Sequence, residues 1–390
     1  MYKILTLNAI SDVIYAQLGE GYAVSAGETQ PDAVFVRSAS MHDMELPATL
    51  LSIARAGAGV NNIPIDRCSQ AGVCVFNTPG ANANAVCELT LAGLLLAGRD
   101  VIGGVQWAQT LKGQGDAVEK LVEKGKGRFA GPELLGKRLG VVGLGAIGVR
   151  VANAAAALGM EVVGYDPSIT VDHAWMLSQH IGRAKSLEEL LETCDYVTLH
   201  LPLTDATRGM IGEAALSRAR KGLRLLNFSR AGLVEGEAMR AAIERGAVAR
   251  YVVDFPTDDM LGVPGVLCIP HLGASTPESE DNCAVMAARQ TRDYLETGAI
   301  RNSVNLPEVA LPPVSKPRLC LIHRNIPNVL GAITAAVSAQ SLNISDLWNR
   351  SRGAMAYSAL DLDAMPADPA ALEQALRGVE GMLRVRMLAP

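Results

Sequence analysis

Three ionisable side chains follow short apolar runs in the middle of the chain: Arg230, Asp258 and His271. Such runs predict buried strands, and open parallel sheets form their ligand crevice at the carboxyl ends of the strands. There an imidazole can accept a hydroxyl proton, a carboxylate can hold the imidazole in one tautomer, and a guanidinium can clamp a carboxylate and its neighbouring oxygen. Together these groups suit the oxidation of a secondary alcohol, provided that a hydride acceptor is bound beside them.

The hydride acceptor is predicted from residues 139–166. A buried strand at 139–142 runs into Gly143-Leu144-Gly145-Ala146-Ile147-Gly148, then an alanine-rich helix, then a strand at 160–165 that ends on Asp166. The first glycine permits a tight turn, the second lets backbone amides approach a pyrophosphate, and the third lets the helix pack on the strand. Asp166 is placed to accept hydrogen bonds from a ribose diol and would repel a 2′-phosphate, so the sequence favours NAD over NADP.

Length and composition restrict the class of protein. With 390 residues the chain is too long for one hydrophobic core, which predicts two or three domains. Hydrophobic residues make up 49% and charged residues 19%, with a net charge of -5, so the composition excludes a disordered chain and indicates no nucleic-acid partner. The N-terminus does not resemble a signal peptide, and the most apolar stretch, 89–98, is about half of a membrane span. We therefore expect a cytosolic protein that does not bind membranes.

The seven cysteines form no CxxC pair and no Cys/His spacing typical of a metal site. Their odd number argues against a disulfide framework. The sequence therefore predicts small buried side chains in a reducing compartment, and no metal. The cysteines are Cys68, Cys74, Cys87, Cys194, Cys268, Cys283 and Cys320.

Short runs rich in Val, Ile and Leu alternate with other segments on both sides of the glycine motif, which is typical of parallel α/β sheets. Before the motif, strands are expected at residues 3–7, 33–36, 52–56 and 73–76, and a helix at 84–96. After Asp166, strands are expected at 196–199, 223–227, 250–254 and 266–269, and helices at 187–193, 213–220 and 235–245. The α/β class is thus predicted with two doubly wound parallel-sheet domains.

The pattern changes near residue 302. A proline-rich stretch at 306–317 lacks periodicity and predicts an extended linker at a domain boundary. Strands are then expected at 318–323, 343–349, 356–363 and 382–387, and helices at 328–340 and 369–378. This βαββαβ order is that of a ferredoxin-like domain, in which a sheet edge commonly pairs with a partner.

Several motifs, in one order over nearly the whole chain, make the sequence resemble the D-isomer-specific 2-hydroxyacid dehydrogenases. Besides the glycine motif they are Ala54-Arg55-Ala56-Gly57-Ala58-Gly59-Val60-Asn61-Asn62-Ile63, Asn77-Thr78-Pro79, Asn227-Phe228-Ser229-Arg230-Ala231-Gly232 and Pro270-His271-Leu272-Gly273-Ala274-Ser275-Thr276. The resemblance implies a Rossmann nucleotide domain, a flavodoxin-like substrate domain and a C-terminal ferredoxin-like ACT domain. The implied ranges are 1–93 plus 272–301 for the substrate domain, 94–271 for the NAD-binding domain, 302–317 for the proline-rich linker and 318–390 for the ACT domain.

For the reaction, the resemblance implies that His271 is the general base, Asp258 its acidic partner and Arg230 the substrate-binding arginine. The family usually has Glu-Pro where this chain has Asp258-Asp259, and the loop is one residue short, so the choice of aspartate stays open; Asp258 is preferred because it follows Phe-Pro-Thr. Asp254 would hold the nicotinamide carboxamide. The other implied cofactor contacts are Gly143, Gly145, Ala146, Ile147, Gly148, Asp166, Leu201, Phe228, Ser229, Gly273 and Ala274.

The resemblance also makes Arg37 a phosphate-binding arginine, and phosphates are well held by arginine forks. The other implied substrate contacts are Ser38, Arg55, Gly57, Ala58, Gly59 and Asn82. The implied reaction is NAD-dependent oxidation of 3-phospho-D-glycerate to 3-phosphohydroxypyruvate, which begins serine synthesis. Alternatives are a reductase of glyoxylate, hydroxypyruvate or another 2-keto acid, a non-catalytic NAD-sensing binding protein, and a merely structural role for Arg37 and Arg55 in surface ion pairs.

In the C-terminal part, the residues that resemble an amino-acid-binding ACT site are His323, Asn325 and Asn343, which would hold an effector such as serine between paired domains. Asn328 replaces a usual glycine and Arg324 a usual acid, so loss of effector binding stays an alternative. The resemblance further implies a homo-oligomer that pairs through the nucleotide domain and through the C-terminal domain.

Overall fold

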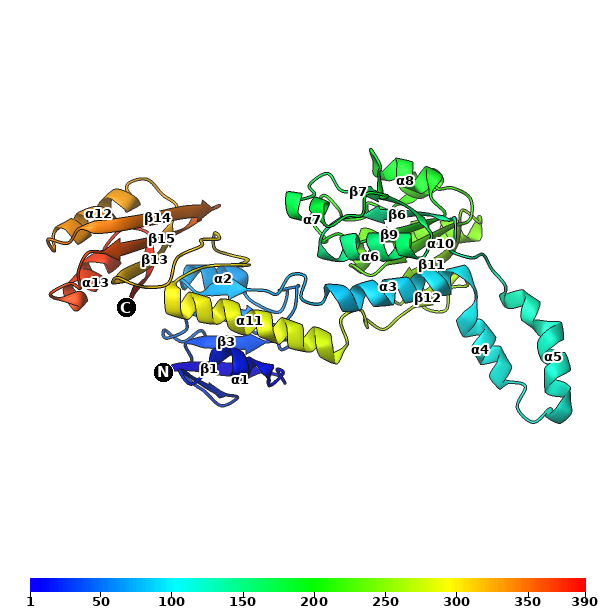
Figure 1. The fold of residues 1–390 in the computed structure, drawn as a ribbon, viewed down its shortest axis with the longest axis horizontal. Helices are drawn as coiled ribbons and strands as arrows, with labels where there is room; N and C mark the ends of the chain where they lie inside the picture. Colours follow the sequence, from blue (N-terminus) through cyan, green and yellow to red (C-terminus); the bar gives the residue numbers. More distant parts are fainter. The chain divides into compact units, whose positions relative to one another are not determined.

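The computed structural model describes residues 1–390 and divides into two compact units (Figure 1). The first unit comprises residues 1–82 with 280–390, and the second comprises residues 83–279. The expected division at 93/94 would cut helix α3 (Ala83–Gly98), which is continuous and packs against helix α6 (Ala146–Ala157). The whole of α3 therefore belongs to the second unit, and the C-terminal sheet belongs to the first.

The first unit contains a five-stranded parallel sheet in the order β2-β1-β3-β4-β5. Its strands are β1 (Tyr2–Leu7), β2 (Tyr22–Ser25), β3 (Ala33–Val36), β4 (Ser52–Arg55) and β5 (Cys74–Phe76), with helices α1 (Val13–Leu18), α2 (Ile65–Gln70) and α11 (Pro277–Thr297). Alternate residues of β3 enter two different cores: Phe35 lies in one, and Val34 and Val36 lie in the other. The edge strand β2 is missing from the sequence prediction because no residue of it is fully buried.

The second unit contains a seven-stranded parallel sheet in the order β12-β11-β10-β9-β6-β7-β8. Its strands are β6 (Arg138–Val142), β7 (Glu161–Tyr165), β8 (Gly182–Arg183), β9 (Tyr196–Leu199), β10 (Leu223–Asn227), β11 (Val248–Val253) and β12 (Val266–Cys268). The order reverses between β6 and β9, and ligands bind at such a point, outside the carboxyl ends of the strands. This is the parallel α/β architecture that the sequence predicts, apart from the two-residue strand β8.

Helices cover both faces of this sheet. On one face α3 and α6 share a core with Leu139, Val141 and Leu226. On the other face lie α8 (Leu187–Thr193), α9 (Glu213–Ser217) and α10 (Gly236–Glu244). The remaining helical segments are α7 (Val171–Trp175) and the single turn η3 (Ala231–Leu233).

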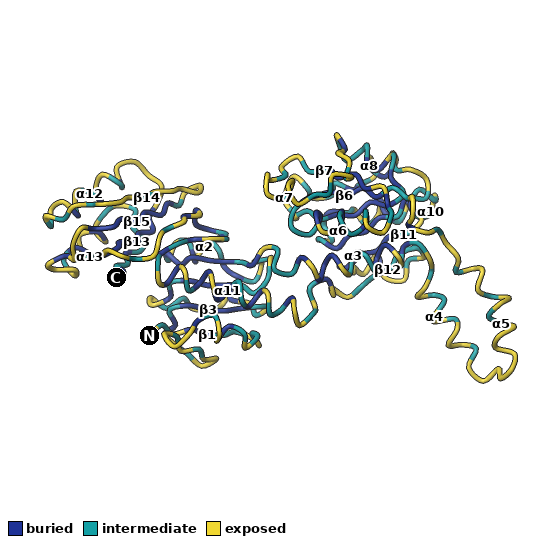
Figure 2. The backbone as a smooth tube through the Cα atoms, in the orientation of Figure 1, coloured by how far each residue is buried: buried dark blue, intermediate teal, exposed yellow.

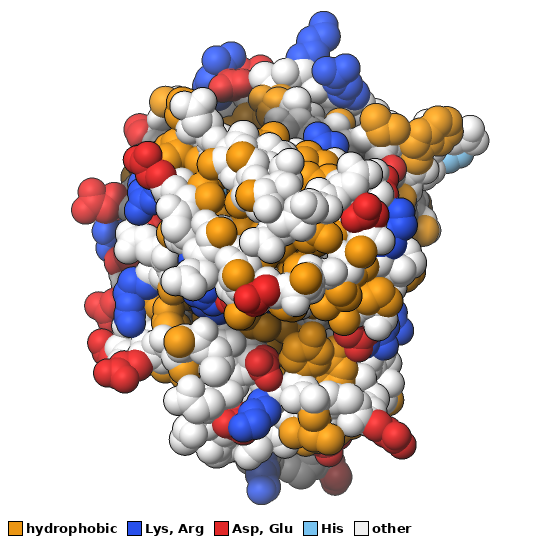
Figure 3. Space-filling model, turned by 90° about the vertical axis from the view of Figure 1, so that its left-hand side faces the viewer, with side chains coloured by type: hydrophobic (Ala, Val, Ile, Leu, Met, Phe, Trp, Pro, Cys, Tyr) orange, Lys and Arg blue, Asp and Glu red, His pale blue; other side chains and the backbone are white.

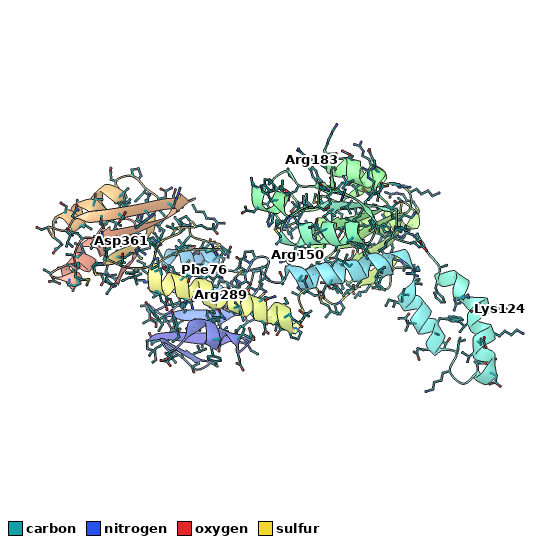
Figure 4. The ribbon with its side chains drawn as sticks, in the orientation of Figure 1. Phe76, Lys124, Arg150, Arg183, Arg289 and Asp361 are labelled. Atoms are coloured by element: carbon teal, nitrogen blue, oxygen red, sulfur yellow. The ribbon has the colours of Figure 1, made fainter.

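A helical hairpin projects from the second unit and was not expected from the sequence (Figures 1 and 2). It consists of α4 (Val101–Gln109), η1 (Gly115–Ala117), α5 (Val118–Gly125) and η2 (Lys126–Phe129), and none of its residues is buried. Trp107 and Phe129 join its limbs with ring centroids 5.4 Å apart. Several of its apolar residues are exposed, including Val101, Ile102 and Val105 at 45%, 41% and 55%. We call this segment the arm; Lys124, labelled in Figure 4, lies on it.

The C-terminal sheet is four-stranded and antiparallel, in the order β14-β15-β13-β16. Its elements are β13 (Arg318–Arg324), α12 (Val329–Ser338), β14 (Ile344–Arg352), β15 (Met355–Leu362), α13 (Pro369–Arg377) and β16 (Met382–Leu388). Leu319 and Leu321 of β13 pack with the two helices, whereas Cys320 and Ile322 join the core of the parallel sheet in the first unit. The two sheets of this unit thus share one core.

The segment 302–317 is packed along an edge strand, which corrects the expectation of an extended linker. Val304 donates a backbone hydrogen bond to the Val75 carbonyl, and the buried Asn305 carboxamide accepts from Val75 and donates to the Val73 carbonyl. These bonds satisfy backbone groups on the outer side of the edge strand β5. The prolines of the segment interrupt secondary structure, but the segment is not a free spacer. Arg318, fully buried, closes the junction through two bonds of 2.6 and 2.8 Å to Asp361, a residue of β15 that is labelled in Figure 4.

No helix of the chain combines the length and the apolar character needed to cross a bilayer. On the face drawn in Figure 3, acidic and basic side chains are interspersed, so that face carries no extended patch of one sign. All seven cysteines are free thiols, and no group of His, Cys, Asp or Glu side chains has the arrangement of a metal site.

Candidate active site

The turn between β6 and α6 requires glycine at two positions and leaves space at a third. Gly143 has a φ of +89°, and a Cβ there would lie 2.5 Å from the carbonyl oxygen of His200. A Cβ on Gly148 would overlap the carbonyl oxygen of Gly143, whereas a Cβ on Gly145 would meet nothing within 4 Å. The open space at Gly145, at the N-terminus of a 12-residue helix that begins with Ala146 and Ile147, fits a pyrophosphate.

Asp166 lies at the carboxyl end of β7, beside this turn. Its carboxylate accepts hydrogen bonds from the backbone N–H groups of Leu144 and Ser168, each at 2.8 Å. Leu201 flanks the same turn, because its methyl group would lie 2.8 Å from a Cβ on Gly143. The acceptor proposed for a ribose diol is therefore held by the glycine turn itself.

Sequence analysis missed His200, which follows β9 and lies against Gly143. Its Nε2 is 3.0 Å from the Thr198 hydroxyl, and its Nδ1 is buried without a partner. Burial lowers the pKa of the imidazole to about 3, so the ring is neutral at physiological pH. The only signal in the sequence was a polar residue directly after a buried strand.

His200 should make the protein sensitive to acid. Because the pKa is depressed in the folded state, the unfolded state binds the proton more readily below pH 6.5, and stability falls as the pH drops toward 3. Between pH 7.5 and pH 5.0 we expect the wild type to lose about 2 kcal/mol more free energy of unfolding than His200→Gln. Urea unfolding at the two pH values measures this difference, and exposed His180→Gln is the control. Parallel losses in wild type and His200→Gln would contradict it.

Asp254 follows β11 and is 1% exposed. Burial raises the pKa of its carboxyl group, and hydrogen bonds from the backbone N–H groups of Gly273 and Leu272, each 2.8 Å long, act in the opposite direction. Both carboxylate oxygens thus hold the loop that carries His271. The neighbouring cofactor candidates are also fixed: the Ser229 hydroxyl donates to the Leu199 carbonyl at 2.7 Å, and Phe228 is 5% exposed.

The structure brings Arg230 and His271 to one aromatic ring. The imidazole of His271 lies 4.4 Å from the Phe255 ring, centroid to centroid, and the guanidinium carbon of Arg230 lies 5.5 Å from the centroid of the same ring. Both residues are exposed. The turn before Arg230 is braced by Asn227, whose side-chain amide donates to the Arg230 carbonyl at 2.8 Å.

The structure brings neither Asp258 nor Asp259 into a hydrogen bond with His271. No hydrogen bond or ion pair joins the imidazole to Asp258 or Asp259 in the structure. Asp258 is exposed, whereas the Asp259 carboxylate lies against Gly236 at the start of α10. Which of the two aspartates pairs with His271 stays a prediction. The exposed Asp258 carboxylate is the one that can turn toward the imidazole.

The substrate candidates of the first unit lie at or after the carboxyl ends of β3, β4 and β5. Arg37 forms an ion pair of 2.6 Å with Glu280, and both side chains are about 40% exposed. Its carbonyl accepts a bond of 3.1 Å from Nε of Arg55, whose guanidinium lies over Gly57.

The other substrate candidates are held mainly through the backbone. The backbone amide of Ser38 donates to Asn8, and the carbonyl of Ala58 accepts from Asn77. Gly59 follows in the same loop, and the buried Asn82 oxygen has no partner.

The three candidate effector contacts in the C-terminal part differ in how far they are buried. His323 is 4% exposed, and its ring nitrogens lie 2.9 Å from the Ser358 hydroxyl and 2.9 Å from the Arg324 carbonyl. Asn325 and Asn343 are exposed. His323 is therefore engaged within its own sheet, whereas the two asparagines are accessible.

Comparison with known proteins agrees with this geometry. Residues 105–273 match the family described as D-isomer specific 2-hydroxyacid dehydrogenase, NAD binding domain. A protein of Escherichia coli (strain K12) named D-3-phosphoglycerate dehydrogenase is 31% identical over 350 residues, which make up 87% of this chain and 82% of that protein. The chain belongs to the D-isomer-specific 2-hydroxyacid dehydrogenase family. The glycine turn thus lies in the family's NAD-binding domain, and NAD as cofactor is confirmed.

Other members of the D-2-hydroxyacid dehydrogenase family differ from this chain in length. A D-3-phosphoglycerate dehydrogenase of Bacillus subtilis (strain 168) is 34% identical over 295 residues, 73% of this chain and 53% of that protein, so the chain spans about half of that relative. The solved structure of NAD⁺-bound 3-phosphoglycerate dehydrogenase from Entamoeba histolytica has a TM-score of 0.61 at 26% identity, and the match covers 78% of this chain and 98% of that one. The parallel-sheet architecture is therefore that of the family.

Proposed function

We propose that this protein oxidises 3-phospho-D-glycerate to 3-phosphohydroxypyruvate with NAD. The observation that carries the proposal is the pair of arginines at the carboxyl ends of β3 and β4 of a 2-hydroxyacid dehydrogenase, where Nε of Arg55 donates to the Arg37 carbonyl. Guanidinium groups here suit a 2-hydroxy acid that carries a phosphate in addition to its carboxylate. The name shared by the relatives in E. coli and B. subtilis supports the same substrate.

In the proposed mechanism, the residues of this chain bind the hydroxy acid and take its proton. Arg230 holds the carboxylate of the substrate in its planar fork. Bound at the glycine turn, with Asp166 on its ribose and Asp254 beside its carboxamide, NAD supplies the hydride acceptor. His271 accepts the proton from the hydroxyl oxygen as the hydride leaves the carbon that bears this hydroxyl, and Asp258 turns to hold the resulting imidazolium.

The test is a substrate panel with the purified full chain. With NAD and 3-phospho-D-glycerate we expect NADH to form, and with NADH and 3-phosphohydroxypyruvate we expect it to be consumed. Turnover of glyoxylate or hydroxypyruvate alone would favour the 2-keto acid reductase. Binding of NADH without turnover of any 2-hydroxy acid would favour a non-catalytic NAD sensor.

Arg37→Gln should affect phosphorylated substrates selectively. A hydrogen bond to a charged group contributes about 1.5 to 3 kcal/mol, so KM for 3-phosphohydroxypyruvate should rise about 10- to 150-fold. KM for hydroxypyruvate should stay within about twofold of the wild-type value, because that substrate has no phosphate for Arg37 to bind. The exposed Arg289→Gln, labelled in Figure 4, is the matched control in the same unit. An equal rise for both substrates would assign Arg37 another role.

We propose that the C-terminal sheet is a ferredoxin-like ACT domain that binds an amino-acid effector such as serine. The order β13-α12-β14-β15-α13-β16 and the strand order β14-β15-β13-β16 support this assignment. The exposed Asn325 and Asn343 are the proposed effector contacts, with His323 fixing the end of β13 from inside. Kinetics with and without serine test this regulation.

We also propose that the protein is a cytosolic homo-oligomer. The arm exposes apolar side chains that a monomer leaves in water, and β14 is an edge strand that pairs only with β15 and has no buried residue. Apolar patches and free edges of this kind are surfaces that a second copy can cover. Light scattering of the full chain measures the number of subunits.

A further inference from the structure

Phe255 lies between the two side chains that the proposed mechanism uses. The residue directly follows Asp254, and its ring contacts the imidazole of His271 at 4.4 Å and the guanidinium of Arg230 at 5.5 Å. Aromatic faces attract guanidinium groups, and tilted ring pairs at this separation are favourable. One ring therefore touches both the proposed base and the proposed substrate clamp.

The imidazole makes no hydrogen bond or ion pair with another side chain. The backbone on either side of His271 is held, because its amide donates to the Ile269 carbonyl and the following two amides donate to Asp254. The left-handed φ of +51° at His271 sets the direction in which its side chain leaves the loop. Because the imidazole makes no hydrogen bond, its contact with the Phe255 ring is a direct restraint on its rotation.

Arg230 depends on the same ring. Its guanidinium donates one hydrogen bond, of 2.6 Å, to the carbonyl of the preceding Ser229 and forms no ion pair. Phe255 is anchored from behind, since it packs against the core on the α10 face of the sheet. It also forms a wall of a pocket that Val253, Met260 and Gly232 line. A ring fixed in this way can hold two flexible side chains at a set separation.

We propose that Phe255 is a positioning residue for the dehydrogenase reaction, which orients the His271 imidazole and the Arg230 guanidinium before substrate binds. The inference rests on the proposed function, in which these two groups act on a 2-hydroxy acid. In the free enzyme, neither Asp258 nor Asp259 reaches the imidazole of His271, and the Phe255 ring is the group that orients this base.

The test compares Phe255→Leu with Phe255→Tyr. Leu removes the ring, so kcat should fall about 10- to 100-fold through misalignment of the base, and KM for the 2-keto acid should rise about two- to fivefold through loss of the cation–π contact. Tyr keeps the ring and should recover most of both losses. The melting temperature and the Kd for NADH should stay close to those of the wild type in both variants. Met260→Leu, which changes another wall of the same pocket, is the matched control.

The outcomes separate this inference from the proposed function. An active wild type whose kcat and KM are unchanged in Phe255→Leu would overturn the positioning role alone. Equal losses in Leu and Tyr, or losses that follow a drop in melting temperature, would assign Phe255 a structural role and also overturn it. A wild type that binds NADH but turns over no 2-hydroxy or 2-keto acid would overturn the proposed function itself.

Discussion

His271→Ala is expected to lower kcat by about 10²- to 10⁴-fold, which is the contribution of a well-placed general base. The variant loses the group that takes the hydroxyl proton, while Asp254 still holds the loop through the backbone amides of Leu272 and Gly273. Binding of NADH should therefore change by no more than about twofold, because no cofactor contact is removed. Initial rates of NADH formation and NADH fluorescence titration measure the two quantities.

The control for this experiment is a histidine outside the site. His180→Ala changes an exposed residue of the second unit and should keep the rate of the wild type. His271→Asn keeps a polar side chain at the left-handed position, where asparagine is tolerated, and should be as slow as alanine because it cannot accept the proton. A rate within tenfold of the wild type in His271→Ala would mean that another group is the base.

The parts of the fold that sequence predicts well depend on local pattern. Strands 33–36, 196–199 and 223–227 have the predicted bounds, because apolar runs of four or five residues are too short for a buried helix and match buried strands. The glycine motif was predictable for a similar reason, since Gly143 and Gly148 meet steric demands of the turn and Gly145 leaves space for a ligand. The arm was not predicted, because α4 and α5 are only nine and eight residues long and α4 contains two adjacent glycines, so no long periodic pattern marks them.

The parts that sequence left open depend on contacts between distant residues. Proline content suggested a free linker at 302–317, but the segment is fixed by Asn305, whose partners lie more than 200 positions earlier. The acidic partner of His271 was open for the same reason: a loop one residue shorter than usual changes the direction of each side chain after Phe255. Composition and spacing define which groups are available, and only the packed loop decides which of them meet.

The second large effect is expected from substitutions in the glycine turn, which distinguish a loss of stability from a loss of cofactor binding. A Cβ on Gly148 would overlap the carbonyl oxygen of Gly143, a backbone atom that cannot move without opening the β6 turn. Gly148→Ala should therefore destabilise the second unit by about 1 to 3 kcal/mol, the usual cost of overpacking, and abolish NADH binding at micromolar concentration. Thermal unfolding and NADH titration measure both effects.

Gly145→Ala is the matched variant within the same turn. Its methyl group would meet nothing within 4 Å, so the melting temperature should be close to that of the wild type. The methyl group would nevertheless stand in the space proposed for the pyrophosphate, and the affinity for NADH should fall about 10- to 100-fold, which corresponds to about 1.4 to 2.8 kcal/mol. Loss of NADH binding without loss of stability in this variant would place the pyrophosphate at Gly145, because only a bound ligand can collide with that methyl group. If Gly145→Ala bound NADH as the wild type does, the dinucleotide would have to lie elsewhere on the turn.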